Sequence, residues 1–330
     1  MRIYILFLVL SFSLKGNAQL KWVNVDSLYQ PLPSSVHVYF TNEPIDTARF
    51  RAYYLIADLK DKEIDFTVDT TLGRRFTPTQ FYQKNDQPLV VLNCTFFSFA
   101  TNRNLTTVIK DGKLVGFNAP VKGVGKDSIN MYYYFKSAIG IFKNRKADIA
   151  WMLTDSAARY PVGYQFPVER FEWGKIEPNL FFTYNDSIYN FSRVEQKRIT
   201  DHKWKAITAV GGGPVLVQNN IIMITNEEER MFTGKAINEK HPRTAMGYTT
   251  DGKLIILMIE GRNTVAHGAT LGQEAQILKD LGCWEAINLD GGGSSCMLVN
   301  GKETIKPSDA TGQRAVPAVF MILTRSKATK

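Results

Sequence analysis

The chain has 330 residues, of which 44% are hydrophobic and 12% are aromatic. This composition is sufficient for a well-packed core and excludes a disordered or fibrous protein. The formal net charge is +9 at pH 7, but Lys and Arg are scattered along the chain and no basic run or nucleic-acid motif occurs. We therefore expect no nucleic-acid partner, because charge of this kind argues only for solubility and for attraction to anionic surfaces or phosphorylated glycans.

The first 18 residues are typical of an export signal. Arg2 supplies the positive start, residues 3–14 are apolar apart from small serines, and residues 16–18 are small enough for cleavage. The apolar run is shorter than the roughly 20 residues that cross a bilayer. We expect cleavage after Ala18, no transmembrane segment afterwards, and a periplasmic, cell-surface or secreted protein. A buried N-terminal strand is the alternative.

Downstream of the signal, two parts are expected: a β-rich segment at 19–87 and a larger domain at 88–330. A helix should begin at Thr77, with Pro78 in its first turn. Residues 125–200 carry few legible patterns and are interpreted as an insertion or cover. Strand composition, rich in Val, Ile, Tyr and Phe, predicts strands within residues 36–40, 49–59, 88–97, 131–142, 147–153, 207–224 and 315–324.

Two Asp-Gly pairs, at residues 111–112 and 251–252, stand between β-prone runs and predict hairpins. The second hairpin leads into a strand, a helix and another strand. The helix should start after Thr270, which forms a capping box with Gln273, and should end before Gly282. Short joints predict that the two strands are parallel. The expected fold class is therefore α+β, with a mixed, mostly antiparallel sheet and a parallel strand–helix–strand unit at 254–290.

Two acidic residues end these two strands, Glu260 the first and Asp290 the second. Parallel strands end at the same sheet edge, where open sheets commonly bind ligands. The carboxylates should lie about 5 Å apart on neighbouring strands, or about 10 Å apart across one intervening strand. Glu274 falls on the apolar face of the helix, so it is expected to pair with an arginine or a backbone amide, or to support the site.

The stretch Asp290-Gly291-Gly292-Gly293-Ser294 has more glycine than a tight turn needs. Successive amides without side chains can form an anion-binding nest, to which a serine hydroxyl adds a donor. No phosphate-binding lysine or GxGxxG fingerprint accompanies it, so it is not a nucleotide motif. A simple structural turn is the alternative. A second loop, residues 211–214 with Gly212, is a weaker signal of the same kind.

Further polar candidates also stand at strand ends: Asn93, Arg243, Thr244 and Arg262. Arginine suits bidentate contact with phosphate, although a structural salt bridge is the alternative for each guanidinium. No pair among the three cysteines has metal-ligand spacing, and buried free thiols or one disulfide are both open. The lining expected for the pocket is thus cationic and amide-rich, with two carboxylates.

Seven segments together resemble the phosphodiester glycosidase family, in its exported bacterial form. They are NCTFF at 93–97, KDGKLVG at 110–116, GGGP at 211–214, RTAMG at 243–247, IEGR at 259–262, GATLGQEAQIL at 268–278 and NLDGGGSS at 288–295. The last is the most specific. Asn93-Cys94-Thr95 stands where the family usually has Asn-Gly-Gly, and Glu260 stands where it usually has Asp.

The resemblance implies hydrolysis of a sugar-1-phosphate diester, of the N-acetylglucosamine-phosphate type, to free sugar and a phosphomonoester. Asp290 would face the anomeric carbon and Glu260 would be the second carboxylate. Asn93, Thr244, the two arginines and the glycine loop would bind sugar hydroxyls or phosphate. No cofactor is expected, and a divalent cation held by carboxylates stays open. The alternatives are a non-catalytic glycan- or phosphoglycan-binding protein and cleavage at phosphorus instead of carbon.

Overall fold

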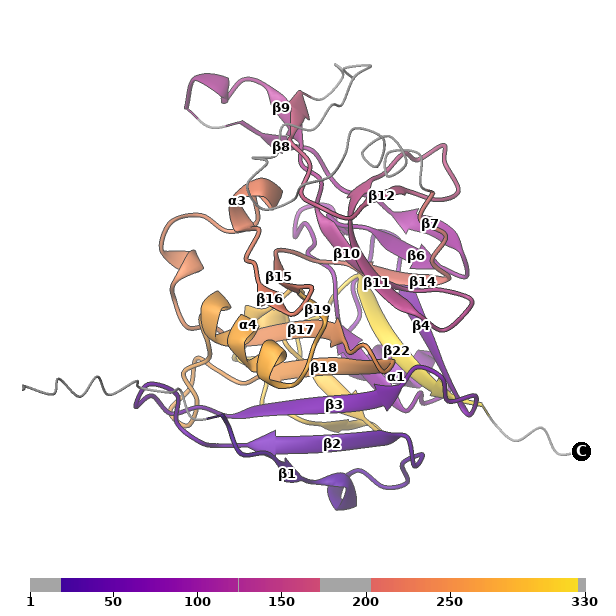
Figure 1. The fold of residues 1–330 in the computed structure, drawn as a ribbon, viewed down its shortest axis with the longest axis vertical. Coiled ribbons are helices and arrows are strands. Elements are labelled where there is room, and N and C mark those ends of the chain that lie inside the picture. Colours follow the sequence, from indigo (N-terminus) through magenta and orange to yellow (C-terminus); the bar gives the residue numbers. More distant parts are fainter. Residues whose placement is uncertain (1–18, 124, 173–202, 326–330) are drawn as a thin grey trace, which may run out of the picture.

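The computed structural model describes residues 19–123, 125–172 and 203–325 (Figure 1). The predicted signal, and part of the predicted insertion, lie outside the described residues. The described chain is mostly antiparallel β-structure arranged in four sheets, with few helices. The α-helices are α1 (Pro78–Lys84), α3 (Asn226–Glu229) and α4 (Leu271–Asp280), and the 3-10 helices are η1 (Asp26–Leu28), η2 (Gly125–Asp127), η3 (Gly234–Ile237) and η4 (Gly292–Ser294).

An eight-stranded sheet carries the predicted strand–helix–strand unit. In spatial order its strands are β1 (Val23–Asn24), β2 (Val36–Thr41), β3 (Ala52–Asp58), β18 (Lys253–Ile259), β17 (Arg243–Tyr248), β19 (Glu285–Asn288), β15 (Val215–Gln218) and β16 (Ile221–Ile222). The N-terminal segment thus adds three strands to the same sheet as β17 to β19.

The predicted α+β class with a parallel unit at 254–290 is wrong. Strands β18 and β19 do not pair with each other, because β17 lies between them and is antiparallel to both. The hairpin at residues 251–252 explains this: β17 already occupies one edge of β18, so helix α4 carries the chain past β17 to its far side. All strand pairs in the described residues are antiparallel.

A five-stranded sheet packs against the eight-stranded one. Its order is β21 (Lys302–Glu303), β20 (Met297–Val299), β5 (Val90–Asn93), β22 (Ala318–Thr324) and β4 (Ile64–Thr70). Apolar side chains of both sheets meet in the largest core cluster, among them Leu55, Met258, Leu92 and Phe320. Since β5 ends at Asn93, this packing brings Asn93 next to the strand ends that carry Glu260 and Asp290.

Two further sheets, of six and three strands, complete the described part of the chain. The six-stranded sheet runs β12 (Val162–Tyr164), β11 (Ala147–Leu153), β10 (Ser137–Ile141), β14 (Thr208–Gly211), β6 (Val108–Lys110) and β7 (Lys113–Gly116). The three-stranded sheet runs β13 (Phe171–Glu172), β9 (Met131–Tyr133) and β8 (Val121–Lys122). Residues 111–112 and 251–252 both connect hairpins, as their Asp-Gly pairs predict.

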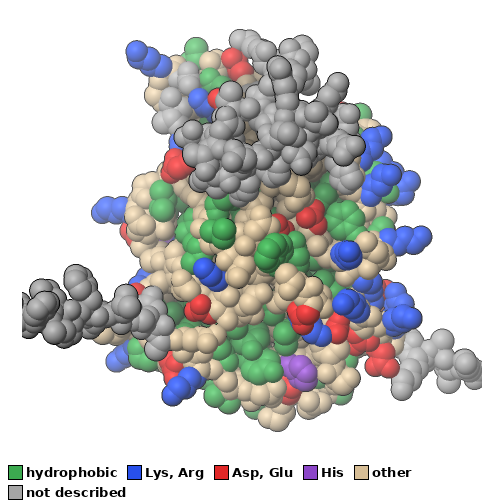
Figure 2. Space-filling view, in the orientation of Figure 1, with side chains coloured by type: hydrophobic (Ala, Val, Ile, Leu, Met, Phe, Trp, Pro, Cys, Tyr) green, Lys and Arg blue, Asp and Glu red, His purple; other side chains and the backbone are tan. Residues whose placement is uncertain are grey.

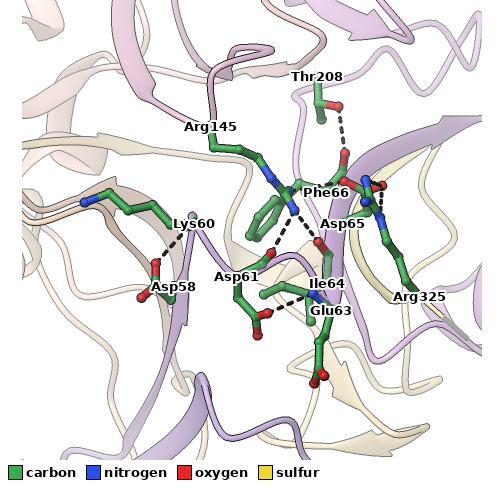
Figure 3. Close-up of polar contacts among 10 residues, drawn as sticks. All are labelled: Asp58, Lys60, Asp61, Glu63, Ile64, Asp65, Phe66, Arg145, Thr208 and Arg325. Carbon is green, nitrogen blue, oxygen red and sulfur yellow. Dashed lines mark hydrogen bonds and ion pairs between the residues drawn. The ribbon is translucent and has the colours of Figure 1, made fainter. Parts of the chain in front are cut away.

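Arg145 ties the six-stranded sheet to the five-stranded one (Figure 3). It lies in the β10–β11 hairpin and donates from Nη2 to the carbonyls of Asp61, at 2.8 Å, and Ile64, at 2.5 Å. Its Nη1 donates to Asp65 at 3.2 Å, a carboxylate that Arg325 also contacts. Such charge-assisted bonds hold strand β4 at a fixed place beneath the hairpin.

Helix α4 forms from the capping box predicted for it. The Thr270 hydroxyl accepts the N–H of Gln273, and the Gln273 side chain accepts the N–H of Thr270. The helix buries Leu271, Ala275 and Leu278 against the outer face of the eight-stranded sheet, in a second core cluster. The capping box and the buried face both confirm the predictions for this helix. The packed helix also brings Glu274 to the sheet, beside Arg243. The three cysteines, at 94, 283 and 296, are buried free thiols.

Candidate functional site

The candidate site lies at the edge of the eight-stranded sheet where β17 begins and β18 and β19 end. Glu260 follows β18, and Asp290 follows β19 after one residue. Pro242, which leads into β17, lies between the two exits: a Cβ on Gly261 would approach its nitrogen and a Cβ on Gly291 its carbonyl oxygen. The two acidic residues therefore leave the sheet at the same edge, with one strand between them.

Asp290 is held in place through its backbone, and the pKa of its carboxyl is suited to proton transfer. Its N–H donates to the Cys94 carbonyl at 2.9 Å, and its own carbonyl accepts the Asn93 amide at 2.5 Å. Burial raises the pKa of the Asp290 carboxyl to about 7, against the opposing effects of the Ser294 hydroxyl, Arg314 and the Gly291 N–H. A carboxyl with a pKa near the working pH is well placed for acid–base work.

Asn93 and Thr244 support Asp290 from within the core. Neither side chain is exposed. The Asn93 Oδ1 accepts the Thr244 hydroxyl at 3.1 Å and the Cys296 N–H at 3.1 Å, while its amide nitrogen is bonded to Asp290. Both the oxygen and the nitrogen of the Asn93 amide are therefore hydrogen-bonded within the protein. The structure places both residues as supports of the Asp290 loop, and their direct contact with substrate stays a prediction.

Glu260 has a different environment. Its side chain is about as buried as the core, at 1% exposure. The carboxylate accepts the Asn263 amide at 2.9 Å and lies 3.7 Å from the Arg51 guanidinium. Glu260 therefore shares the edge with Asp290, but its oxygens are engaged inside the protein.

The glycine loop is packed against two arginines. The Arg262 guanidinium lies over Gly292, within 3.1 Å of where a Cβ would stand, and Gly292 has a φ of +62°. Arg314 and Asp309 occupy the space where a Cβ on Gly293 would stand. A side chain at either position would displace a guanidinium, which explains the glycines.

Three amides of this loop are already hydrogen-bonded. The Gly291 N–H donates to the Asp290 carboxylate. The Gly292 N–H donates to the Pro242 carbonyl at 2.9 Å, and the Ser294 N–H donates to the Gly291 carbonyl at 3.1 Å. The predicted cradle of successive amides is therefore largely closed by internal bonds. The cationic groups at this edge are the guanidinium groups packed on the loop.

Arg262 and Arg243 differ in accessibility. Arg262 is exposed, and its Nη2 lies 3.2 Å from the His241 Nδ1. Arg243 is 3% exposed, donates from Nε to the Ala269 carbonyl at 3.0 Å, and stacks over Phe232. Of the two guanidinium groups, only that of Arg262 is therefore open to solvent. Burial and the two nearby guanidinium groups lower the pKa of His241, which favours its neutral form.

Glu274, in helix α4, and Asn288, at the end of β19, are buried and have unsatisfied side-chain oxygens. Both Glu274 oxygens and the Asn288 Oδ1 have no hydrogen-bond partner among the described residues. Burial raises the pKa of Glu274 to about 8, although the charge of Arg243 opposes this. The Asn288 amide nitrogen donates to the Gly213 carbonyl at 2.7 Å, next to Gly212. Glu274 thus has a nearby arginine, as predicted, but no hydrogen bond to it.

Replacing Glu274 with glutamine is expected to flatten the pH dependence of stability. Because its folded pKa is raised, the native state keeps a proton that the unfolded chain has lost between about pH 4.5 and 8. Stability in the wild type therefore falls as pH rises through this window, by about 1.4 kcal/mol per pH unit from this group. Urea unfolding at pH 5 and pH 8 should show a smaller fall in the variant. Equal slopes would contradict the assignment.

Several groups at the site carried no motif. Three of them stand outside the glycine loop in sequence, in loops or next to a strand: Arg51, Asp309 and Arg314. Asn288 belonged to a motif only as a neighbour of Asp290. Arg314 donates to both Asp309 oxygens, at 2.7 and 2.8 Å, and lies 3.4 Å from the Ser294 hydroxyl. Among the described residues, no group of three or more His, Cys, Asp or Glu side chains could hold a metal ion.

Comparison with known proteins identifies this arrangement. Residues 169–323 match the family model described as phosphodiester glycosidase. The matched residues make up somewhat less than half of the chain, and this part is similar to the phosphodiester glycosidase family. It is 31% identical over 124 residues to N-acetylglucosamine-1-phosphodiester alpha-N-acetylglucosaminidase of Bos taurus, covering 35% of this chain and 23% of that protein. It is 40% identical over 87 residues to an uncharacterized prophage-derived protein of Bacillus subtilis, and this match covers 26% of this chain and 13% of that protein.

A solved structure shares the fold. The zebrafish N-acetylglucosamine-1-phosphodiester alpha-N-acetylglucosaminidase catalytic domain, described as auto-inhibited by its pro-peptide, superposes with a TM-score of 0.60 and 20% identity. The match covers 94% of this chain and 90% of that one. The curated relatives are much longer than the parts matched, since this chain spans less than a quarter of the Bos taurus protein. The comparisons therefore show the fold, and they show a similarity to the phosphodiester glycosidase family over residues 169–323.

Proposed function

We propose that the protein hydrolyses a sugar-1-phosphate diester, of the N-acetylglucosamine-phosphate type, to free sugar and a phosphomonoester. The similarity to the phosphodiester glycosidase family supports a glycosidase of this general kind. The observation that carries the proposal is Asp290, a partly buried residue whose carboxyl has a pKa raised to about 7, beside a loop on which two guanidinium groups pack. Such a site joins a titrating carboxyl for the glycosidic carbon to cations for the phosphate.

The division of roles follows from the contacts. Arg262 is exposed and receives the phosphate, whose departure needs little protonation because a phosphate is a good leaving group. Asp290, when ionised, acts toward the anomeric carbon as nucleophile or as base for water. Asn93 and Thr244 fix its backbone, and Arg314 lies near its carboxylate. Glu260, paired with Arg51, holds the neighbouring strand end and adds negative charge to the edge.

The export signal predicted at residues 1–18 places this activity outside the cytoplasm. Among the described residues, no helix is long and apolar enough to cross a membrane. Basic side chains are spread around the face seen in Figure 2 rather than gathered in a single patch. A phosphoglycan of the envelope or the surroundings is the substrate class that fits an exported, cationic glycosidase.

A non-catalytic glycan-binding protein is the second candidate. The burial of Glu260 favours it, because a glycosidase normally presents two carboxylates to its substrate. Incubation of the wild type with methyl N-acetylglucosaminyl phosphate, a phosphodiester, separates the two. Release of reducing sugar supports the enzyme. Saturable binding of the intact diester without release would establish the binding protein instead.

Replacing Arg262 with methionine is expected to weaken action on a phosphodiester. The loss of one charge-assisted contact costs about 1.5–3 kcal/mol in kcat/KM. A neutral aryl N-acetylglucosaminide should lose much less, if it is turned over. Lys143→Ala, which removes a charge from the exposed β10–β11 hairpin, is the control. An equal loss in Lys143→Ala would mean that Arg262 contributes only general charge.

A further inference from the structure

A large cleft opens beside the candidate site and has no part in the roles above. It has a volume of about 1240 Å³ and is lined by residues that the structure describes throughout. Four segments surround it: residues 70–73 after β4, residues 101–105, residues 115–120 after β7, and residues 153–156 after β11. None of the residues assigned to the Asp290 site lines it.

One loop separates the cleft from Asp290. Cys94, whose carbonyl accepts the Asp290 N–H, is followed by Thr95, whose hydroxyl donates to the Asn104 Oδ1 at 2.6 Å. Asn104 lines the cleft. Since one residue spans at most about 3.6 Å, the cleft wall begins roughly 10 Å from Asp290. The two sites are therefore close neighbours in the fold, as a single ligand that spans both would require.

A second connection runs through Phe99. This side chain is 61% exposed at the tip of the same loop. Arg314, which lies beside Ser294 and Asp290, stacks over the Phe99 ring at 5.4 Å, and Arg75 stacks over it at 5.0 Å. The loop thus turns one side toward the arginines at the glycine loop and the other toward the cleft.

The lining suits an uncharged, hydroxyl-rich ligand. Most of its polar side chains are amides and hydroxyls, and they alternate with apolar ones such as Val115, Phe117 and Leu153. Arg103 and Asp155 are the only charged side chains that line it. The Asn102 Oδ1 is buried and has no hydrogen-bond partner among the described residues, while its nitrogen donates to the Gly73 carbonyl at 3.2 Å. Asn102 thus has an unsatisfied oxygen behind the cleft wall, which a small shift of its side chain would present to a sugar hydroxyl.

We propose that this cleft binds the glycan on the far side of the phosphate, the part that leaves as phosphomonoester. The inference rests on the proposed function, because it assumes a phosphodiester held at Asp290. Its volume exceeds that of pockets for a single small ligand, commonly about 300–1,000 Å³, so several sugar units fit. Sugar C–H faces would pack on the apolar strip, and hydroxyls would meet the amides.

Two substrates and one pair of variants test this. The short substrate is methyl N-acetylglucosaminyl phosphate, and the long one carries a neutral trisaccharide in place of methyl. Ser156 is an exposed cleft residue, so Ser156→Trp should fill the cleft without disturbing the fold, and Ser156→Ala is the matched control. We expect Ser156→Trp to raise KM for the long substrate about tenfold or more and to leave kcat and both constants for the short substrate unchanged.

Equal kcat/KM for the two substrates in the wild type, or an unchanged KM for the long one in Ser156→Trp, would overturn the inference. Titration of the free trisaccharide keeps the test independent of turnover. Binding to the wild type that is lost in Ser156→Trp and kept in Ser156→Ala supports the cleft even if neither diester is hydrolysed, an outcome that would defeat only the proposed function. No binding of the trisaccharide and no preference for the long substrate would defeat the cleft assignment alone.

Discussion

Asp290→Asn is expected to lower kcat on a sugar phosphodiester by about 1000-fold or more while the protein stays folded. A positioned acid–base group contributes about 10²–10⁴-fold, and a nucleophile is needed absolutely. Asparagine keeps the shape of the side chain but cannot become a carboxylate. Stability should not fall, because the raised pKa of Asp290 makes the wild type lose stability as pH rises from about 3.8 to about 7, and asparagine avoids this loss.

The dependence of kcat/KM on pH tests this expectation most sharply. Wild-type kcat/KM should rise with pH on its acid side, with an apparent pKa near 7, as Asp290 ionises. Asp26→Asn is the matched control: Asp26 accepts from the Val38 N–H near the far strands of the eight-stranded sheet and takes no part in the site. It should keep wild-type kinetics. Normal turnover in Asp290→Asn, with an unshifted acid limb, would remove Asp290 from the chemistry.

Glu229→Ala is expected to give the largest loss of stability. This carboxylate is fully buried and joins three parts of the fold through five donors. Its Oε1 accepts from the Thr225 hydroxyl, the Val215 N–H and the Trp151 Nε1, at 2.6, 2.9 and 3.2 Å. Its Oε2 accepts from the Ser137 N–H and hydroxyl at 2.8 and 2.7 Å.

Alanine would leave these buried N–H groups without acceptors, each at a cost of about 1–3 kcal/mol. We expect the free energy of unfolding in urea to fall by about 4 kcal/mol or more. Glu229→Gln, which keeps one oxygen, should lose less. Glu227→Ala, at an exposed position of the same helix, should change stability by under about 1 kcal/mol. A loss in Glu229→Ala as small as in Glu227→Ala would show that the five bonds contribute little.

Local patterns in the sequence predicted local structure well. The cap at Thr77 with Pro78 after it and the capping box at Thr270 predicted helices α1 and α4, and the Asp-Gly pairs predicted two hairpins. The acidic strand ends brought Glu260 and Asp290 to one edge even though the pairing was wrong. Both strands run in the same direction on either side of β17, so the argument about strand ends needed only their direction.

The pairing of strands that lie far apart in the sequence could not be predicted. A strand–helix–strand pattern is the same whether its strands are neighbours or have another strand between them, and the preceding hairpin decided the matter. The site has the same limitation. Arg314 reaches Ser294 from a loop without a motif, and Arg51 reaches Glu260 from the start of β3. These pairs are formed by the packing of separate segments, and no periodic pattern in the sequence indicates either pair.

Hydrolysis in ¹⁸O-labelled water tests the central claim most directly. The wild type is incubated with methyl N-acetylglucosaminyl phosphate in labelled water, and both products are weighed by mass spectrometry. If Asp290 directs attack at the anomeric carbon, the label should appear in the released sugar and the methyl phosphate should remain unlabelled. Label in the phosphate would show cleavage at phosphorus and would contradict the account of this site as a glycosidase.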